Sequence, residues 1–399
     1  MTLFSAWSGP RRPKMLLVGE AWGEHEETAR APFVGESGKE LWRMLGEAMP
    51  DLWPSEHARV ADLHRFGLAW IKSRTDWLSE ASIAFTNVFN FRPLNNKIPS
   101  ICCAKKDLPH DYDCGEFPAL VRGLYLQPQY LPELFRLRDE IRESAPNLVV
   151  AMGNTATWAT LQATNISSIR GNTTSSSIMG RPIKVLPTYH PASLLYEGQW
   201  QRRPIIVTDL MKACRESQFP DIRRPRRSIL INPTLAEIRD WRDSVFQNPP
   251  PYLACDTETT AGLIDTIGFA KSADDAIVSM IGPHRVKIGQ RFDYIFPKRD
   301  GQKTSSYFTV EEELQFWPLI FSLLESNIPK VFQNGLYDLQ YLLKLGCCPN
   351  NCTEDTMLLH HSLYPEQQKS LGFLGSIHTD ESSWKLMRKH HADTEKRDE

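Results

Sequence analysis

The chain has 399 residues, of which 41% are hydrophobic, and its formal net charge at pH 7 is −2. This length is sufficient for two domains that each bury a core. No apolar stretch approaches the roughly 20 residues that a membrane helix needs, and the N-terminus lacks a signal-peptide core, so we expect a cytoplasmic protein without a membrane partner. The 8 cysteines are then expected to be reduced thiols. The small net charge limits nucleic-acid contacts to local patches.

The first distinctive stretch is a short apolar run followed by an acidic loop. Residues 15–18 predict a buried parallel strand, and Gly19 marks the tight turn at its end. In the following loop, Glu20 and Glu26 are candidate functional carboxylates, and the ring of Phe33 is expected to face the same pocket. Gly35 and Gly38 are expected to let the backbone approach a ligand closely before a helix begins. The loop has two more acidic residues, which we interpret as a solvated face: Glu24 and Glu27.

The next region predicts helices and then a second strand. Residues 39–80 have amphipathic helical spacing in pieces, interrupted by Pro50 and Pro54. Residues 83–93 form a largely apolar and β-branched run that ends at Pro93, which predicts a second buried strand. Within it, the amide of Asn87 offers both a hydrogen-bond donor and an acceptor.

The alternation of strands and helices continues along the first half. Residues 129–145 carry leucines at helical spacing, and residues 147–152 predict another buried strand that ends at Gly153. A last strand at 183–186 leads into a loop that contains His190. Strands that alternate with helices favour a parallel sheet covered on both faces, so the predicted fold class is α/β.

Five short motifs follow one another in this half of the chain. They read GEAWG at 19–23, PFVG at 32–35, TNV at 86–88, RG at 170–171 and HPAS at 190–193. In this order they resemble the motifs of the uracil-DNA glycosylase superfamily, closest to its family-4 members. The resemblance covers residues 15–196 and implies a three-layer α/β/α domain that acts in DNA repair.

The chemistry of base excision requires two opposite charges to be stabilised. Hydrolysis of the bond between uracil and deoxyribose leaves negative charge on the base and positive character on the sugar. A carboxylate near the sugar and an imidazole that donates to the base oxygen meet these needs. The resemblance implies catalytic roles for Glu20, Glu26 and His190, on a base that is flipped from a duplex or lies in single-stranded DNA. It implies substrate binding by Phe33, which stacks on the base, Asn87, which reads its edge, and Arg170.

Two departures from the family pattern bear on the site. Trp22 replaces the proline of GEAPG, which changes the bulk and rigidity of the loop and indicates either a pocket for another modified base or lost activity. Phe91 replaces a cysteine that ligates an iron–sulfur cluster in family-4 enzymes, and the N-terminal cysteine pair is missing too, so no cluster is expected. A zinc site is an alternative use of thiols, but the spacing of the candidates fits no standard pattern. These candidates are Cys102, Cys103, His110 and Cys114.

A basic run at 223–227 separates the two halves, and we interpret it as a solvated linker between domains at 1–222 and 228–399. In the second half, Asp256 and Glu258 lie two residues apart in an expected strand, which places both carboxylates on one face. Hard oxygen ligands in such an arrangement suit Mg²⁺ or Mn²⁺. The surrounding sequence resembles the first motif of DnaQ-like 3′–5′ exonucleases, of the family-A DNA polymerase proofreading type. Asp338 lies in a resemblance to the second motif.

The third exonuclease motif, a tyrosine followed by an aspartate four residues later, is missing. Asp393 and Asp398 are acids of a charged tail and are better explained by chance. A two-metal site needs its full ligand set, so we expect a partial RNase H-like domain that is C-terminally incomplete. It would be a fragment, or the first part of a split gene, completed by a partner chain.

The leading hypothesis is a glycosylase that releases uracil or a related damaged base from DNA, with an attached exonuclease-like module, as in a virus or phage replication system. The glycosylase itself would need no cofactor. One alternative is a non-catalytic DNA-binding or replisome-docking protein, with a DNA polymerase as a partner. Another is a metal-dependent 3′–5′ exonuclease completed by a second chain.

Overall fold

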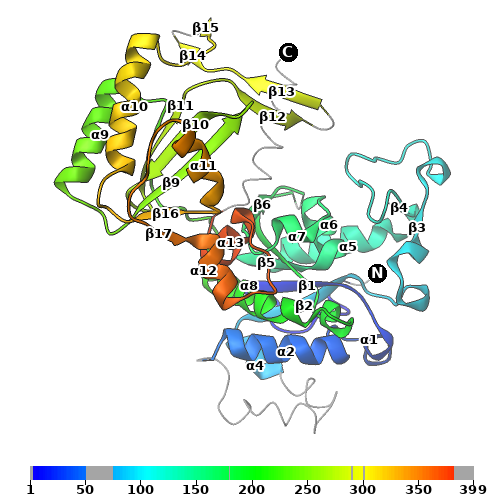
Figure 1. Cartoon of the computed structure of the whole chain (residues 1–399). Helices are drawn as coiled ribbons and strands as arrows, with labels where there is room; N and C mark the ends of the chain where they lie inside the picture. Colours follow the sequence, from blue (N-terminus) through cyan, green and yellow to red (C-terminus); the bar gives the residue numbers. More distant parts are fainter. Residues whose placement is uncertain (1–2, 51–74, 179, 289–290, 300–301, 382–399) are drawn as a thin grey trace. The chain divides into compact units, whose positions relative to one another are not determined.

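The structure is a computed structural model that describes residues 3–50, 75–178, 180–288, 291–299 and 302–381. These residues form two compact units (Figure 1). The first unit contains the described residues of 3–223 together with 372–381, and the second contains those of 224–371.

The first unit is built around a five-stranded sheet in which four strands are parallel. The order across the sheet is β2-β1-β5-β7-β6, and β6 runs antiparallel to its neighbour β7. The strands are β1 (Met15–Ala21), β2 (Ile83–Phe89), β5 (Leu148–Met152), β6 (Thr174–Ser176) and β7 (Ile183–Thr188).

The register of the parallel strands brings their carboxyl ends to one edge of the sheet. Gly19 of β1 lies opposite Asn87 of β2, and Met152 of β5 lies opposite Thr188 of β7. In open α/β sheets, ligands bind at this edge.

Helices cover both faces of this sheet, as the uninterrupted apolar runs of its strands predict. Leu17 packs into the core on the side of α2 (Glu36–Ala48) and α8 (Arg203–Glu216), whereas Leu16 packs on the opposite side with α5 (Leu131–Ser144) and α6 (Gly153–Leu161). Shorter elements are α1 (Glu24–Ala29), α4 (Thr75–Glu80), α7 (Ile166–Ile169), β3 (Cys102–Cys103) and β4 (Tyr125–Leu126). The first unit is therefore a three-layer α/β/α structure.

The second unit contains a six-stranded mixed sheet in the order β17-β16-β9-β10-β11-β8. The central strands β9, β10 and β11 are antiparallel, β16 and β17 run parallel to β9, and β8 runs parallel to β11. The strands are β8 (Ser228–Ile231), β9 (Leu253–Thr260), β10 (Leu263–Ala270), β11 (Asp275–Met280), β16 (Lys330–Phe332) and β17 (Cys352–Asp355). Two hairpins add β12 (His284–Ile288) with β13 (Arg291–Ile295), and β14 (Lys298–Arg299) with β15 (Gln302–Lys303).

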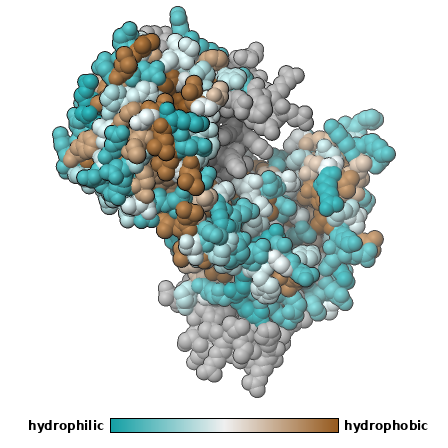
Figure 2. Space-filling view, in the orientation of Figure 1, coloured by the Kyte–Doolittle hydropathy of each residue, from teal (hydrophilic) through white to brown (hydrophobic). Residues whose placement is uncertain are grey.

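The described part of this unit includes the helices α9 (Leu235–Gln247), α10 (Val310–Leu324), α11 (Leu336–Lys344) and α12 (Thr356–Leu363). Figure 1 shows α9 and α10 side by side on one face of the sheet, and both contribute to its core. Figure 2 shows hydrophobic side chains on the visible surface over α11 and α12. The exposed residues there include Leu336, Leu343, Leu358, Leu359 and Leu363.

The observed boundaries of the two units agree with the predicted domain ranges at the linker but differ from them after residue 371. The change of unit between Arg223 and Arg224 lies within the predicted linker 223–227, which is exposed coil. However, 372–381, which the sequence analysis assigned to the second domain, pack with the first unit. The reason is apolar contact, because Phe373 and Leu374 at the start of α13 (Leu371–His378) are buried in the first unit's core.

Some predicted segments and residues lie partly or wholly outside the described residues. The predicted helical stretch 39–80 overlaps α2 and contains α4, whereas 51–74 lie outside the described residues, as do Asp393 and Asp398. Among the helices that the structure describes, none is both long enough and apolar enough to span a membrane.

Candidate active site

The candidate site lies at the carboxyl edge of the first sheet, where Gly19 is in close contact with two predicted site residues. A Cβ at Gly19 would lie 2.2 Å from Oδ1 of Asn87 and 2.5 Å from Cζ of Phe33. Both side chains are buried, with 3% and 4% of their surface exposed. The lack of a side chain at Gly19 therefore allows the amide and the ring to meet beside the end of β1.

The ring of Phe33 forms one wall of this site. It stacks on the imidazole of His190 at a centroid distance of 6.0 Å and also contacts Phe85. The backbone of Phe33 has a left-handed φ of 55°, and its carbonyl would lie 2.1 Å from a Cβ at Gly38. Gly38 was expected to admit a ligand, but in the structure it admits the Phe33 backbone at the start of α2.

Glu20 follows directly on Gly19, and two opposing effects act on the pKa of its carboxyl group. Burial raises the pKa of Glu20, while a hydrogen bond from the Thr155 hydroxyl to its Oε2 (2.5 Å) opposes this shift. Thr155 lies in the first turn of α6, directly after β5. The carboxyl group of Glu20 is thus held by the helix that follows β5, in a poorly hydrated position at the sheet edge.

His190 lies in the loop after β7, and its protonation state follows from its contacts. Desolvation by burial lowers the pKa of His190 to about 4, so the imidazole is neutral at pH 7. Its Nδ1 accepts a hydrogen bond from the backbone N–H of Ala192 at 3.1 Å, which assigns the single proton to Nε2. His190 therefore presents a neutral Nε2–H donor.

Glu26 is placed differently from the other predicted catalytic groups. Its Oε1 accepts hydrogen bonds from the backbone N–H groups of Val34 and Gly35, and its Oε2 accepts one from Gly23. These three bonds join the two ends of the loop that carries Phe33. Glu26 thus holds the loop, whereas the sequence analysis expected it to act in the chemical step.

Arg170 also differs from its predicted place, because its side chain is buried rather than open to DNA. Only 1% of its surface is exposed, and its guanidinium binds both carboxylate oxygens of Asp209. A guanidinium paired in this way has its charge neutralised inside the protein. It does not join Glu20, Phe33 and His190 at the site.

A buried ionic group supports Asn87 from behind. Arg136 of α5 donates to the backbone carbonyls of Asn87 and Val88 at 2.7 and 2.9 Å. The same guanidinium binds the carboxylates of Glu133 and Glu140, all with 4% exposure or less. The end of β2 is therefore fixed by charge-assisted hydrogen bonds to the helix that covers it.

The residues that depart from the family pattern are packed close to each other. The backbone N–H of Trp22 donates to the carbonyl of Phe91 at 3.2 Å, and the Phe91 ring stacks on Tyr130 at 5.2 Å. Phe91 thus fills its position by aromatic packing. Burial raises the pKa of Cys102 to about 11 and also raises the pKa of Cys103, so these thiols stay protonated.

In the second unit, the three predicted metal ligands lie near one another on and beside β9. Asp256 and Glu258 are exposed on the same face of the strand, while the Asp338 carboxylate accepts hydrogen bonds from the backbone and hydroxyl of Thr257. Partial desolvation, followed by the charges of Asp338 and Glu258, raises the pKa of Asp256 to about 6. Among the described residues, no group of three or more His, Cys, Asp or Glu side chains is arranged to hold a metal ion.

Three residues that bind predicted site residues were not predicted from the sequence: Thr155, Arg136 and Asp209. Thr155 was detectable in principle, because it lies two residues beyond the glycine that ends a predicted strand. Arg136 and Asp209 sit within amphipathic helices, where a charged residue ordinarily faces solvent. Nothing local in the sequence distinguishes them.

The fold and site define an α/β protein with a carboxylate, a neutral imidazole, an aromatic ring and an amide gathered at the carboxyl edge of a parallel sheet. The family model of the uracil DNA glycosylase superfamily matches residues 6–209, which contain all of these groups. The chain belongs to this superfamily.

Curated relatives match the same half of the chain. The type-4 uracil-DNA glycosylase of Archaeoglobus fulgidus is 27% identical over 197 residues, which cover 48% of this chain and 71% of that protein. That of Saccharolobus solfataricus is 26% identical over 193 residues (47% and 65%), and that of Thermotoga maritima is 25% identical over 203 residues (50% and 76%).

Solved structures give a weaker likeness. Brucella melitensis NrnC is 18% identical, with a TM-score of 0.24, and the match covers 39% of this chain and 61% of that one. The same protein with bound Mg²⁺ matches with 16% identity and the same TM-score, over 39% and 62%. A likeness of this size carries no information about function.

Proposed function

We propose that the first unit hydrolyses the N-glycosidic bond of uracil, or of a related damaged base, in DNA. The observation that carries the proposal is the pairing of a desolvated carboxylate, Glu20, with a neutral imidazole, His190, at one sheet edge. Phe33, which stacks on His190, and Asn87, which lies beside Gly19, offer an apolar face and an amide suited to the ring and the polar edge of a flipped base.

Each group has a distinct part in the proposed reaction. The Glu20 carboxylate orients water and stabilises positive character on the sugar, in a poorly hydrated position where its charge is most effective. The Nε2–H of His190 donates to the base oxygen that gains negative charge. A neutral donor is sufficient for this, because it stabilises an anion without first having to transfer its proton.

The direct test is incubation of the protein with a labelled single-stranded oligonucleotide that contains one uracil, in the presence of EDTA, followed by alkali and a denaturing gel. EDTA suppresses metal-dependent nucleases, so strand scission at the uracil identifies glycosylase activity. The same oligonucleotide with thymine is the control. If the uracil strand stays intact, the same assay is repeated with other damaged bases, and intact strands throughout would refute the proposal and favour a non-catalytic DNA-binding protein.

For the second unit we propose an exonuclease-like module, incomplete by itself. One support is that Asp256 and Glu258 lie on a common face of β9, beside Asp338. The other is the sheet, in which parallel strands are added to an antiparallel meander, as expected of an RNase H-like fold. Among the described residues, no three His, Cys, Asp or Glu side chains form a metal-ligating group, so we expect the module to need a further ligand for any metal-dependent step.

The test of the module is shortening of labelled DNA from its 3′ end in Mg²⁺ or Mn²⁺. We expect no shortening by this chain alone and shortening once a partner chain, such as a DNA polymerase or the second product of a split gene, supplies the missing ligand. The Asp256→Ala variant should then be inactive. Shortening that persists in Asp256→Ala would refute the assignment of this carboxylate.

A further inference from the structure

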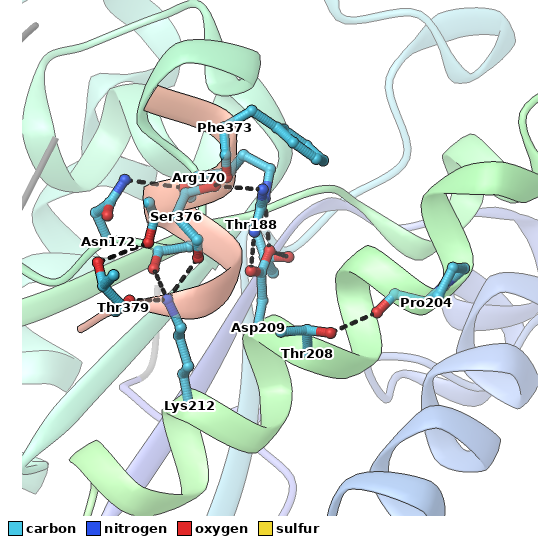
Figure 3. Close-up of polar contacts among 12 residues, drawn as sticks. Arg170, Asn172, Thr188, Pro204, Thr208, Asp209, Lys212, Phe373, Ser376 and Thr379 are labelled. Atoms are coloured by element: carbon cyan, nitrogen blue, oxygen red, sulfur yellow. Dashed lines mark hydrogen bonds and ion pairs between the residues drawn. The ribbon is translucent and has the colours of Figure 1, made fainter. Parts of the chain in front are cut away.

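A large buried polar cluster outside the pocket joins α13 to the rest of the first unit (Figure 3). Two residues of α8, Asp209 and Lys212, and Arg170 of the loop after α7 form its centre, and the two cations reach residues that come more than 160 positions later in the chain. All three side chains are at most 4% exposed. Buried charges of this kind require partners, so the partners of these three residues show how α13 is bound to the first unit.

Arg170 binds the docked helix directly and is linked to the sheet through Asp209 of α8. Its guanidinium donates to the Ser376 hydroxyl at 2.9 Å and to both oxygens of Asp209. Asp209 in turn accepts a hydrogen bond from the hydroxyl of Thr188 at 2.6 Å. The ring of Phe373 packs 5.5 Å from the guanidinium carbon, which adds a cation–π contact.

Lys212 binds the carboxyl end of the same helix. Its ammonium donates to the carbonyl oxygens of Ser376 and Thr379 and to that of Gly171 at 3.2 Å. A cation at the end of a helix also interacts favourably with the helix dipole. Burial lowers the pKa of Lys212 to about 8, so this ammonium depends on the three carbonyls for its solvation.

The cluster also reaches the end of β7, which carries the candidate catalytic imidazole. Thr188 is the last residue of β7 and precedes His190 by two positions. The backbone N–H of Gly171 donates to the carbonyl of Pro187 at 2.9 Å, and a Cβ at Gly171 would lie 2.7 Å from Asp209. The docked helix, the Arg170–Gly171 loop and the strand end are therefore in continuous contact.

We propose that residues 372–379 are an intramolecular ligand of the glycosylase-like unit, which docks on Arg170 and Lys212 and thereby fixes the end of β7 and the His190 loop. Arg170, Asp209 and Lys212 are positioning residues in this arrangement. The docking itself is independent of the reaction, whereas its effect on base release rests on the proposed function.

The test compares two variants of the full chain that both remove a cation from α8. Lys212→Met deletes the buried ammonium, and Arg215→Met deletes an exposed one that pairs with Asp380 at 3.3 Å on the same segment. We expect Lys212→Met to lower the unfolding temperature of the first unit by about 5–12 °C, because three buried carbonyls lose their donor. Arg215→Met should lower it by less than about 2 °C. Equal unfolding temperatures for the two variants would overturn the docking.

A kinetic measurement tests the effect on the site. Under single-turnover conditions with the uracil oligonucleotide, we expect Lys212→Met to release base about tenfold more slowly, with DNA affinity within about twofold of the parent. A loss of affinity without a loss of rate, or no change in either, would overturn the positioning role. If the parent releases no base, the proposed function fails, while the unfolding temperatures still decide the docking.

A milder variant covers the case in which Lys212→Met does not fold. Ser376→Ala removes one acceptor of Arg170 while Asp209 still holds the guanidinium. We expect its unfolding temperature to fall by about 2–6 °C. An unfolding temperature equal to that of the parent would count against docking through this contact.

Discussion

The individual residues of the pocket have sharply different tasks, although several are of the same chemical type. Glu20 and Glu26 are both acids of one loop, yet Glu20 accepts from the Thr155 hydroxyl and Glu26 binds three backbone N–H groups. A carboxylate with three backbone donors is committed to holding the chain. We therefore assign the proposed chemical role to Glu20, whose carboxylate makes fewer hydrogen bonds.

Replacement of these two acids separates the two tasks. Glu20→Gln keeps the size of the side chain and removes its charge, so we expect base release to slow at least about 100-fold with an unchanged unfolding temperature. Glu26→Gln should instead destabilise the loop, because an amide N–H₂ facing a backbone N–H replaces an accepting oxygen. Circular dichroism melts beside single-turnover rates distinguish these outcomes, and equal loss of rate without loss of stability in both would contradict the division.

The lowered pKa of His190 predicts a pH dependence of stability. The unfolded imidazole binds a proton near pH 6.5 and the folded one only near pH 4, so protons favour the unfolded state between these values. The contribution of the neutral His190 to the free energy of unfolding is complete above pH 6.5. It is lost as the pH falls toward 4, by up to roughly 3 kcal/mol. Urea unfolding of the parent and of His190→Gln across this range measures it. Identical pH dependence of the two proteins would contradict the assignment.

Among the elements, α5 is bound to the sheet by charge as well as by apolar packing. Arg136 joins Glu133, Glu140 and the end of β2, with almost no solvent exposure. Breaking a buried ion group by removing one partner is costly, because the remaining charges stay buried without compensation. The helix therefore depends on this one cation far more than on any of its surface charges.

The same helix supplies the matched control. We expect Arg136→Met to destabilise the first unit by about 3–5 kcal/mol, because two carboxylates lose their partner. Arg142→Met breaks an exposed pair with Asp139 and should cost at most about 0.5 kcal/mol. Denaturant unfolding of both variants, followed by probes of the first unit, gives the comparison. Similar unfolding midpoints for the two variants would show that the buried ion pairs of Arg136 stabilise the first unit no more than the exposed pair of Arg142 does.

For the whole molecule, docking of α13 predicts that the first unit survives a break in its chain. A specific protease site placed in the exposed segment 224–226 would allow cleavage outside the described helices and strands. We expect the two fragments to elute together in size-exclusion chromatography at moderate salt and to separate in denaturant.

The control for this experiment is the Lys212→Met variant with the same protease site. Its fragments should separate more readily, because the buried ammonium that binds the docked segment is lost. Separation of the parent fragments without denaturant would contradict strong docking of 372–379.

How far the sequence could predict this structure depends on the distance over which each feature is encoded. The strands at β1, β2, β5 and β7 follow from local apolar runs, and the sheet edge follows from their parallel order. The gathering of Glu20, Phe33, Asn87 and His190 rests on that order and on the family resemblance.

Features that depend on partners distant in sequence were not predictable. Arg170 is 206 positions from Ser376, and no periodicity links a loop arginine to a helix that far away. Gly38 illustrates the same limit at short range, because the sequence indicates a close approach without saying whether a ligand or Phe33 makes it.

The assignment of 372–379 to the first unit has a consequence for biosynthesis. A ribosome releases 3–223 long before it reaches α13, and domains otherwise tend to complete their folding during synthesis as each emerges. In the nascent chain, Lys212 and Arg170 therefore lack their partners in α13 until residues 224–371 have been translated. If the docked segment fixes the His190 loop as proposed, this loop reaches its final state only after residues 224–371 have been made.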